Sequence, residues 1–126
     1  MLKKLKILLA DDEAILRLDL REMLTDAGHE VIGEAANGEE AVKLARELKP
    51  EFIIMDVKMP VMDGLEAARL IRKSGKPDAA TVSIFALTAN AFAEDVEKTK
   101  AAGMNAHLSK PIEAKALIAA LYKVKK

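Results

Sequence analysis

The chain has 126 residues, of which 20 are Lys or Arg and 20 are Asp or Glu, so its formal net charge at neutral pH is zero. This balance gives no electrostatic reason to expect binding to nucleic acid or to a membrane surface. The absence of cysteine excludes disulfides and thiolate metal sites. No apolar run approaches the roughly 20 residues of a membrane span. Length and composition therefore predict one cytoplasmic domain over residues 1–126.

Short apolar runs alternate with helical patterns along the whole chain. The first helical pattern places Leu16, Leu20, Met23, Leu24 and Ala27 at steps of three and four residues, before a stop at Gly28. The later helices show the same spacing, and their ends are marked by Gly and Pro. The expected elements are, in order, strand 7–10, helix 14–27, strand 31–35, helix 39–48, strand 52–55, helix 64–73, strand 82–87, helix 93–102, strand 106–109 and helix 113–123.

Five strands that alternate with five helices predict a parallel sheet with right-handed crossovers and helices on both faces. The fold class is therefore α/β, with a single doubly wound five-stranded sheet. We expect the flavodoxin-like strand order 2-1-3-4-5, which is one of the two common orders of such sheets. Connections of a few residues leave no room for a linker or a second domain.

Chemically interesting side chains follow four of the five expected strands. They are Asp11 and Asp12, Asp56, Thr88 and Lys110. In a parallel sheet all carboxyl ends of strands lie on one edge, where open α/β sheets bind their ligands. Each of these residues alone is more often a cap or a turn residue. Together they predict one crevice that holds three carboxylates, a hydroxyl and an ammonium group.

Three carboxylates that lie close together repel one another unless a cation joins them. Mg²⁺ suits such a set, because it takes one or two carboxylates, keeps several waters and binds phosphate oxygens. An ammonium group and a hydroxyl beside the metal would contact further phosphoryl oxygens. Phosphoryl transfer relies mainly on such positioning and charge stabilisation, and an ionised carboxylate can serve as its nucleophile.

Five motifs agree in order and spacing with one known family. They are Asp-Asp at 11–12, Met-Asp at 55–56, Met-Pro-Val-Met-Asp-Gly at 59–64, Ala-Leu-Thr-Ala at 86–89 and Leu-Ser-Lys-Pro at 108–111. From about Lys6 to Val124, the chain resembles a receiver domain of two-component response regulators, of the chemotaxis type with a single domain. The resemblance implies a phosphorelay signalling switch rather than an enzyme with a turnover substrate.

The resemblance also implies the residue roles. Asp56 would accept a phosphoryl group from a phosphohistidine of a histidine kinase or a phosphotransfer domain. Mg²⁺, or Mn²⁺ in its place, would be bound by Asp11, Asp12, Asp56 and the backbone carbonyl of Lys58. The phosphoryl group would be bound by Thr88, the backbone of Ala89 and Lys110, with a cis peptide bond before Pro111.

Switching would change the surface formed by the helix over 93–102, the strand over 106–109 and the last helix. The family usually has Tyr or Phe where this chain has His107, which would move together with Thr88. The plain interpretation is that His107 fills the aromatic position. The alternative hypothesis is a pH-sensitive rotation, which unchanged switching between about pH 5.5 and 8 would exclude. In the family that the chain resembles, the positions of Lys58 and Asn90 influence how fast the acyl phosphate hydrolyses, and we expect slow to moderate hydrolysis here.

Other classes fit the sequence less well. A phosphatase with an aspartyl-phosphate intermediate expects an acid two residues after a nucleophile on the first strand, and here Asp11-Asp12-Glu13-Ala14 follows that strand. A flavin-binding module expects a phosphate-binding loop there and aromatic stacking residues, but the chain has three Phe, one Tyr and no Trp. A purely structural receiver, which cannot be phosphorylated, also fits less well, because this chain has all the residues of the phosphorylation site.

The chain is expected to be a stand-alone receiver or a module of a larger protein, and a monomer or a weak dimer that depends on phosphorylation. Its first half resembles receivers attached to RNA-binding antitermination domains. The stretch 86–95 resembles receivers of hybrid histidine kinases.

Overall fold

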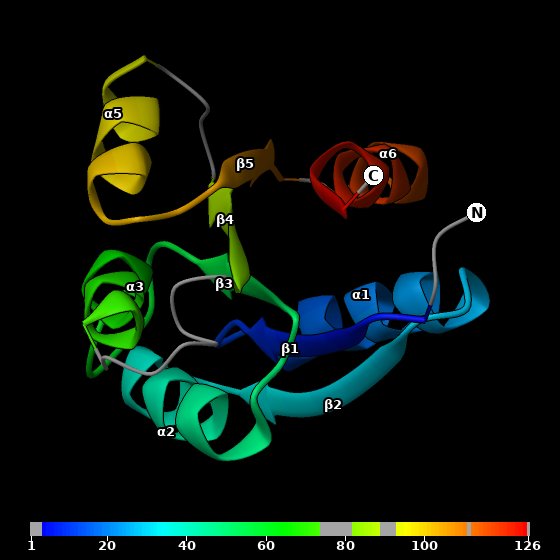
Figure 1. The fold of residues 1–126 in the computed structure, drawn as a ribbon, viewed down its shortest axis with the longest axis horizontal. Helices are drawn as coiled ribbons and strands as arrows, with labels where there is room; N and C mark the ends of the chain where they lie inside the picture. The colour runs from blue at the N-terminus through cyan, green and yellow to red at the C-terminus, as the bar shows by residue number, and fades with distance from the viewer. Residues whose placement is uncertain (1–3, 74–81, 89–92, 111, 126) are drawn as a thin grey trace.

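The structure is a computed structural model, which describes residues 4–73, 82–88, 93–110 and 112–125. Strands and helices alternate along the described residues, as the sequence predicts (Figure 1). The elements are β1 (Lys6–Ala10), α1 (Ala14–Asp26), β2 (Glu30–Ala35), α2 (Gly38–Leu48), β3 (Phe52–Asp56), α3 (Gly64–Arg72), β4 (Ser83–Thr88), α5 (Ala93–Ala101), β5 (Ala106–Ser109) and α6 (Ala114–Lys125).

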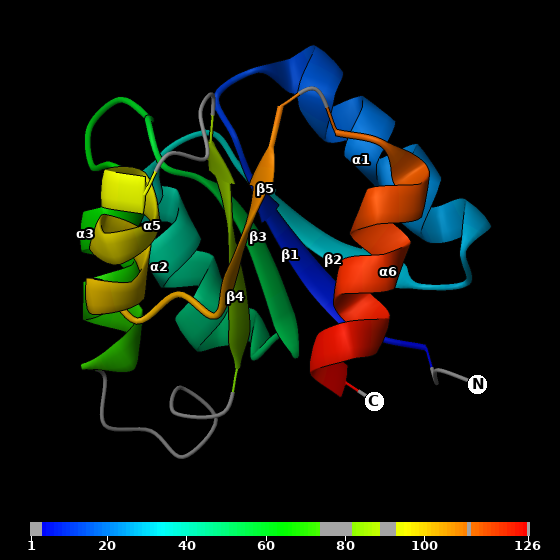
Figure 2. The same cartoon turned by 90° about the horizontal axis from the view of Figure 1, so that it is seen from above.

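The five strands form one parallel sheet in the order β2-β1-β3-β4-β5, which confirms the expected order. Helices α1 and α6 cover one face of the sheet, and α2, α3 and α5 cover the other (Figure 2). The central strands are therefore buried on both faces, and all five residues of β3 are buried. Among the described residues, no helix is long and apolar enough to cross a membrane.

The two faces of the sheet are packed with side chains of different size. On the α1/α6 face, leucines from both helices meet the T-shaped pair of Phe52 and Phe85, whose ring centroids are 4.8 Å apart. On the other face, alanines let α2 and α3 approach the sheet and each other closely; they are Ala41, Ala45, Ala67 and Ala68. Successive residues of a strand point to opposite faces of the sheet, so each strand contributes different side chains to the two faces.

The helix ends lie within two residues of the predicted ones. Asn37 caps α2 by accepting a hydrogen bond from the Glu40 amide at 2.9 Å, and Asp63 caps α3 by accepting one from Glu66 at 2.9 Å. The prediction that α1 extends to Ala27 is wrong. The helix ends at Asp26, and Ala27 is exposed at the C-cap because Gly28 turns the chain with φ of 91°.

Two glycines hold the loop that follows β3 against the sheet. A Cβ atom on Gly64 would lie 2.2 Å from the carbonyl oxygen of Asp56, and one on Gly38 would lie 2.1 Å from that of Met62. Both contacts are with backbone, which cannot rotate away. The Gly64 amide also donates to the Val57 carbonyl at 2.9 Å. The loop over residues 57–63 is thereby fixed next to the end of β3.

Candidate functional site

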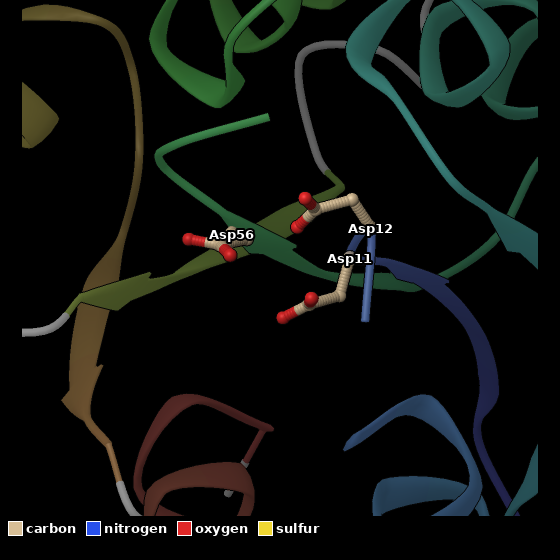
Figure 3. Close-up of side chains that lie close together, drawn as sticks. All are labelled: Asp11, Asp12 and Asp56. Atoms are coloured by element: carbon tan, nitrogen blue, oxygen red, sulfur yellow. The ribbon is translucent and has the colours of Figure 1, made fainter. Parts of the chain in front are cut away.

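Three carboxylates meet where β1 and β3 end. Asp11 and Asp12 follow β1, Asp56 is the last residue of β3, and one oxygen from each lies within 4.8 Å of the others (Figure 3). Asp11 is fully buried and Asp56 is only 6% exposed, whereas Asp12 is exposed. The structure thus brings together the three acids that the sequence analysis selected.

The predicted ammonium group reaches the same point from β5. The Nζ of Lys110 lies 2.9 Å from Asp56 Oδ2, 3.3 Å from Asp11 Oδ2 and 3.4 Å from Glu13 Oε1. The backbone amide of Lys110 donates to the Thr88 carbonyl at 2.9 Å, which fixes the end of β5 beside β4. Strand pairing therefore places the lysine, and its long side chain spans the distance to the acids.

The charges of the site shift one another's ionisation. Burial raises the pKa of the Asp11 carboxyl, and the charge of Asp56 raises it further, against the lowering effects of the Glu13 amide and of Lys110. Burial alone would lower the pKa of Lys110, but its hydrogen bond and ion pair with Asp56, and those with Asp11, outweigh burial and raise it. Lys110 is therefore fully charged, and Asp11 resists ionisation more than an exposed aspartate does.

Two buried oxygen atoms of the site have no hydrogen-bond partner among the described residues. They are Asp11 Oδ2, which has only its ion pair with Lys110, and Thr88 Oγ1. Buried oxygens without partners are costly unless a ligand or an ion supplies the missing contact. Unpartnered carboxylate oxygen next to two further acids suits a hard divalent cation such as Mg²⁺. The donor set therefore fits the metal that the sequence analysis expects.

A cleft of about 810 Å³ opens beside these side chains. Its walls include Asp12, Asp56, Lys58, Thr88 and Lys110, which the sequence analysis had selected. The backbone amide of Lys58 donates to Asp56 Oδ1 at 3.1 Å, and the ligand role of its carbonyl stays a prediction.

Lys98 and Thr99 of α5 are among the residues of the cleft wall that were not predicted from the sequence. They lie in the body of a helix rather than at a strand end. No local sequence signal separates them from other helical Lys and Thr residues, so only the packing of α5 places them here.

His107 lies away from the acids. It pairs with Ala86 across β5 and β4 and lines a separate groove of about 280 Å³, together with Val96 and Met104. Its switching role stays a prediction. The predicted roles of Ala89, Asn90 and Pro111 concern positions outside the described residues.

Comparison with known proteins identifies the arrangement. The family model described as the response regulator receiver domain matches residues 7–122. Chemotaxis protein CheY of Thermotoga maritima is 38% identical over 121 residues, which cover 96% of this chain and 98% of that protein. Transcriptional regulatory protein PdtaR of Mycobacterium tuberculosis is 44% identical over 116 residues, which cover 92% of this chain. The chain spans only about half of PdtaR, 54% of its length.

A solved structure extends the likeness to the site. The receiver domain of sensor histidine kinase PA1611 from Pseudomonas aeruginosa, which has a magnesium ion coordinated in its active site cleft, superposes with a TM-score of 0.85. It is 36% identical and the match covers 96% of this chain and 97% of that one. The fold of this chain therefore has a counterpart in a solved receiver domain that holds a magnesium ion in its active site cleft.

Proposed function

Because the chain belongs to the response regulator receiver domain family, we propose that it is a phosphorelay switch whose Asp56 accepts a phosphoryl group. The donor is a phosphohistidine of a histidine kinase or of a phosphotransfer domain. One observation carries the proposal: Asp56 stands at a buried strand end within 4.8 Å of two further carboxylates and 2.9 Å from a lysine ammonium. A carboxylate in that setting is held and charge-balanced for phosphoryl chemistry.

The chemical step needs little from the protein besides position and charge. An oxygen of Asp56 bonds to phosphorus while the bond from phosphorus to the donor's imidazole nitrogen breaks, and that nitrogen keeps the electron pair. An ionised carboxylate needs no general base when it acts as the nucleophile. Once negative charge has passed from the Asp56 carboxylate to the phosphoryl group, the Lys110 ammonium pairs with a phosphoryl oxygen. Thr88, whose buried hydroxyl has no other partner among the described residues, donates a hydrogen bond to one of them.

Asp11, Asp12, Asp56 and the Lys58 carbonyl would hold Mg²⁺, or Mn²⁺ in its place. The bound metal would neutralise negative charge between the carboxylates and the incoming phosphoryl group. The residues of the chain do the rest. Lys58 fixes Asp56 through its backbone amide, and Lys110 keeps Asp56 and Asp11 from repelling each other in the metal-free chain.

The output of the switch is a change of surface. When Thr88 moves toward the phosphoryl group, the space behind it opens to His107, and the face formed by α5, β5 and α6 changes. A partner protein that binds this face reads the change. The chain therefore acts as a binding module that catalyses only its own phosphorylation and dephosphorylation, and Lys58 and Asn90 set how long the acyl phosphate lasts.

Intact-protein mass spectrometry tests the proposal. Incubation with Mg²⁺ and a small phosphodonor is expected to add the mass of one phosphoryl group, and omission of the metal or the substitution Asp56→Asn is expected to prevent it. Glu13→Gln is the matched control, because it removes an exposed acid 3.4 Å from the same lysine but not the acceptor. If the wild-type chain gains no mass with any donor, or if Asp56→Asn gains as much, the proposal is wrong.

A further inference from the structure

Arg17, in the first turn of α1, contacts two other segments at once. Its Nε donates to Glu34 Oε1 on β2 at 3.1 Å, and its Nη1 donates to the backbone carbonyl oxygen of Asp11. The side chains of Arg17 and Glu34 are mostly buried, with 18% and 29% exposed. The other oxygen of Glu34 is bonded by Arg21 at 2.8 Å, so both oxygens of this carboxylate have a partner.

The carbonyl that Arg17 bonds belongs to the peptide that joins Asp11 to Asp12. The amide side of Asp11 is also held, because it donates to the Ala35 carbonyl at 3.0 Å. The two bonds hold the peptide units on either side of Asp11, and the bond from Arg17 orients the unit that carries Asp12. The Asp11 amide is bonded to β2 directly, at Ala35, and the Asp11 carbonyl is connected to β2 through Arg17 and Glu34.

Asp12 depends on this backbone more than the other two acids do. Asp11 accepts a hydrogen bond from the Glu13 amide at 2.8 Å, and Asp56 accepts one from Lys110 at 2.9 Å. The side chain of Asp12 is exposed and makes no hydrogen bond to another described residue. Its direction toward the cluster is therefore set by the peptide that precedes it.

We infer that Arg17 is a positioning residue for the metal site: it orients the peptide between Asp11 and Asp12, and thereby the Asp12 carboxylate. The inference rests on the proposed function, since it assigns Asp12 to Mg²⁺. Groups that orient metal ligands typically change metal affinity tenfold or more when they are removed.

Simple electrostatics predicts the opposite sign. A guanidinium bonded to Asp11 is a positive charge near the cation site, so its removal would favour a bound cation if charge were its main effect. A loss of metal affinity on removal of Arg17 is therefore a specific sign of positioning. Arg21 supplies a matched control, because it binds the same Glu34 carboxylate and, among the described residues, makes no hydrogen bond or ion pair with Asp11.

Isothermal titration with MgCl₂ of the unphosphorylated chain separates the two effects. Arg17→Met is expected to weaken Mg²⁺ binding roughly tenfold, while Arg21→Met stays close to wild type or binds slightly more tightly. In the metal-free chain, the Asp12 amide resonance is expected to shift in Arg17→Met and to stay in place in Arg21→Met. Equal affinities in the two variants, or tighter binding by Arg17→Met, would overturn the inference.

Arg17→Lys covers the case in which Arg17→Met does not fold. Lysine keeps the charge, but its single ammonium cannot bond Glu34 and the Asp11 carbonyl with the same fork, so Mg²⁺ binding is again expected to weaken. Wild-type affinity in a folded Arg17→Lys would contradict positioning by the fork. The inference and the proposed function can fail separately. Phosphoryl uptake by the wild-type chain tests the function, whereas the comparison of the Arg17 and Arg21 variants measures Mg²⁺ binding without phosphorylation.

Discussion

At the edge where the strands of the sheet begin, side chains of the described residues hydrogen-bond the backbone, and at the edge where the strands end, two buried side-chain oxygens of the described residues accept or donate no hydrogen bond. Before β1 and β2, the Leu5 amide donates to His29 Nδ1 at 3.1 Å. Before β4 and β5, Arg72 bonds carbonyl oxygens of both preceding segments. The two buried side-chain atoms without a hydrogen bond among the described residues, in Asp11 and Thr88, both lie at the other edge.

The difference shows how one sheet separates stability from function. A buried polar atom without a partner costs about 1–3 kcal/mol, so it persists only where something else uses it. The carboxyl edge of this sheet keeps such atoms together with three acids, and a cation or a phosphoryl group can supply the missing contacts. The amino edge holds the fold together. Substitutions at the two edges should therefore change stability in opposite directions.

The largest expected effect is at the amino edge. Arg72 donates to the carbonyls of Gly103 and Val82 at 3.0 and 2.7 Å and to Asn105 Oδ1 at 2.8 Å, so it joins α3 to the starts of β4 and β5. Arg72→Met should lower the free energy of unfolding by about 3 kcal/mol, because hydrogen bonds from a charged group are lost together. Urea unfolding measures it. The exposed Arg69 on the same helix is the control, and an equal effect of Arg69→Met would contradict the role of Arg72.

The opposite edge should respond with the opposite sign. Asp11→Asn keeps an oxygen for the Glu13 amide but removes a buried negative charge that lies close to Asp56. Without metal, the variant should be more stable than wild type by about 1 kcal/mol, since a buried charge is costly. Saturating Mg²⁺ should reverse the order, because the wild type gains about 2.7 kcal/mol at a hundredfold excess over its dissociation constant and the variant gains less.

The dependence of this difference on pH has a definite sign. The pKa of Asp11 is raised in the folded chain, so the folded state binds a proton more readily than the unfolded state. The cost of its charge is complete above the folded pKa and disappears as pH falls below it. Urea unfolding in the presence of a chelator should therefore show the advantage of Asp11→Asn shrinking in acid. A variant that is less stable than wild type without metal at neutral pH would remove the contrast between the two edges.

The site residues at the strand ends could be predicted from the sequence because local patterns determine their positions. Four of the five strands are short apolar runs that end at, or are followed by, a polar residue, and a parallel sheet brings all strand ends of this kind to one edge. Asp11, Asp56, Thr88 and Lys110 needed only that rule. Even Lys110, which is 54 residues from Asp56, follows from the strand order.

Contacts that depend on long side chains or on helix packing could not be predicted. The placement of Arg72 requires knowing that the end of α3 lies beside the segments before β4 and β5. Lys98 enters the cleft wall only because of how α5 sits against the sheet. The end of α1 was predicted one residue late, because Ala27 continues the apolar spacing although Gly28 already turns the chain.

A further effect of about one hydrogen bond is expected at the amino edge, and it depends on pH. His29 Nδ1 accepts the Leu5 amide, so this nitrogen must be unprotonated, and burial lowers the pKa of His29 below its usual value of 6.5. The folded chain therefore binds the proton less readily than the unfolded chain. Its contribution to stability is complete above pH 6.5 and is lost as pH falls toward the folded pKa.

The loss is about that of one hydrogen bond, roughly 1 kcal/mol. Urea unfolding of wild type and His29→Gln at a series of pH values isolates this contribution, because both chains keep His107 and every carboxylate. The stability of the wild type should fall relative to the variant as the solution becomes acidic. If the difference in unfolding free energy between wild type and His29→Gln is the same at every pH, protonation of His29 does not break its hydrogen bond with the Leu5 amide. The amino edge would then be less sensitive to charge than its geometry indicates.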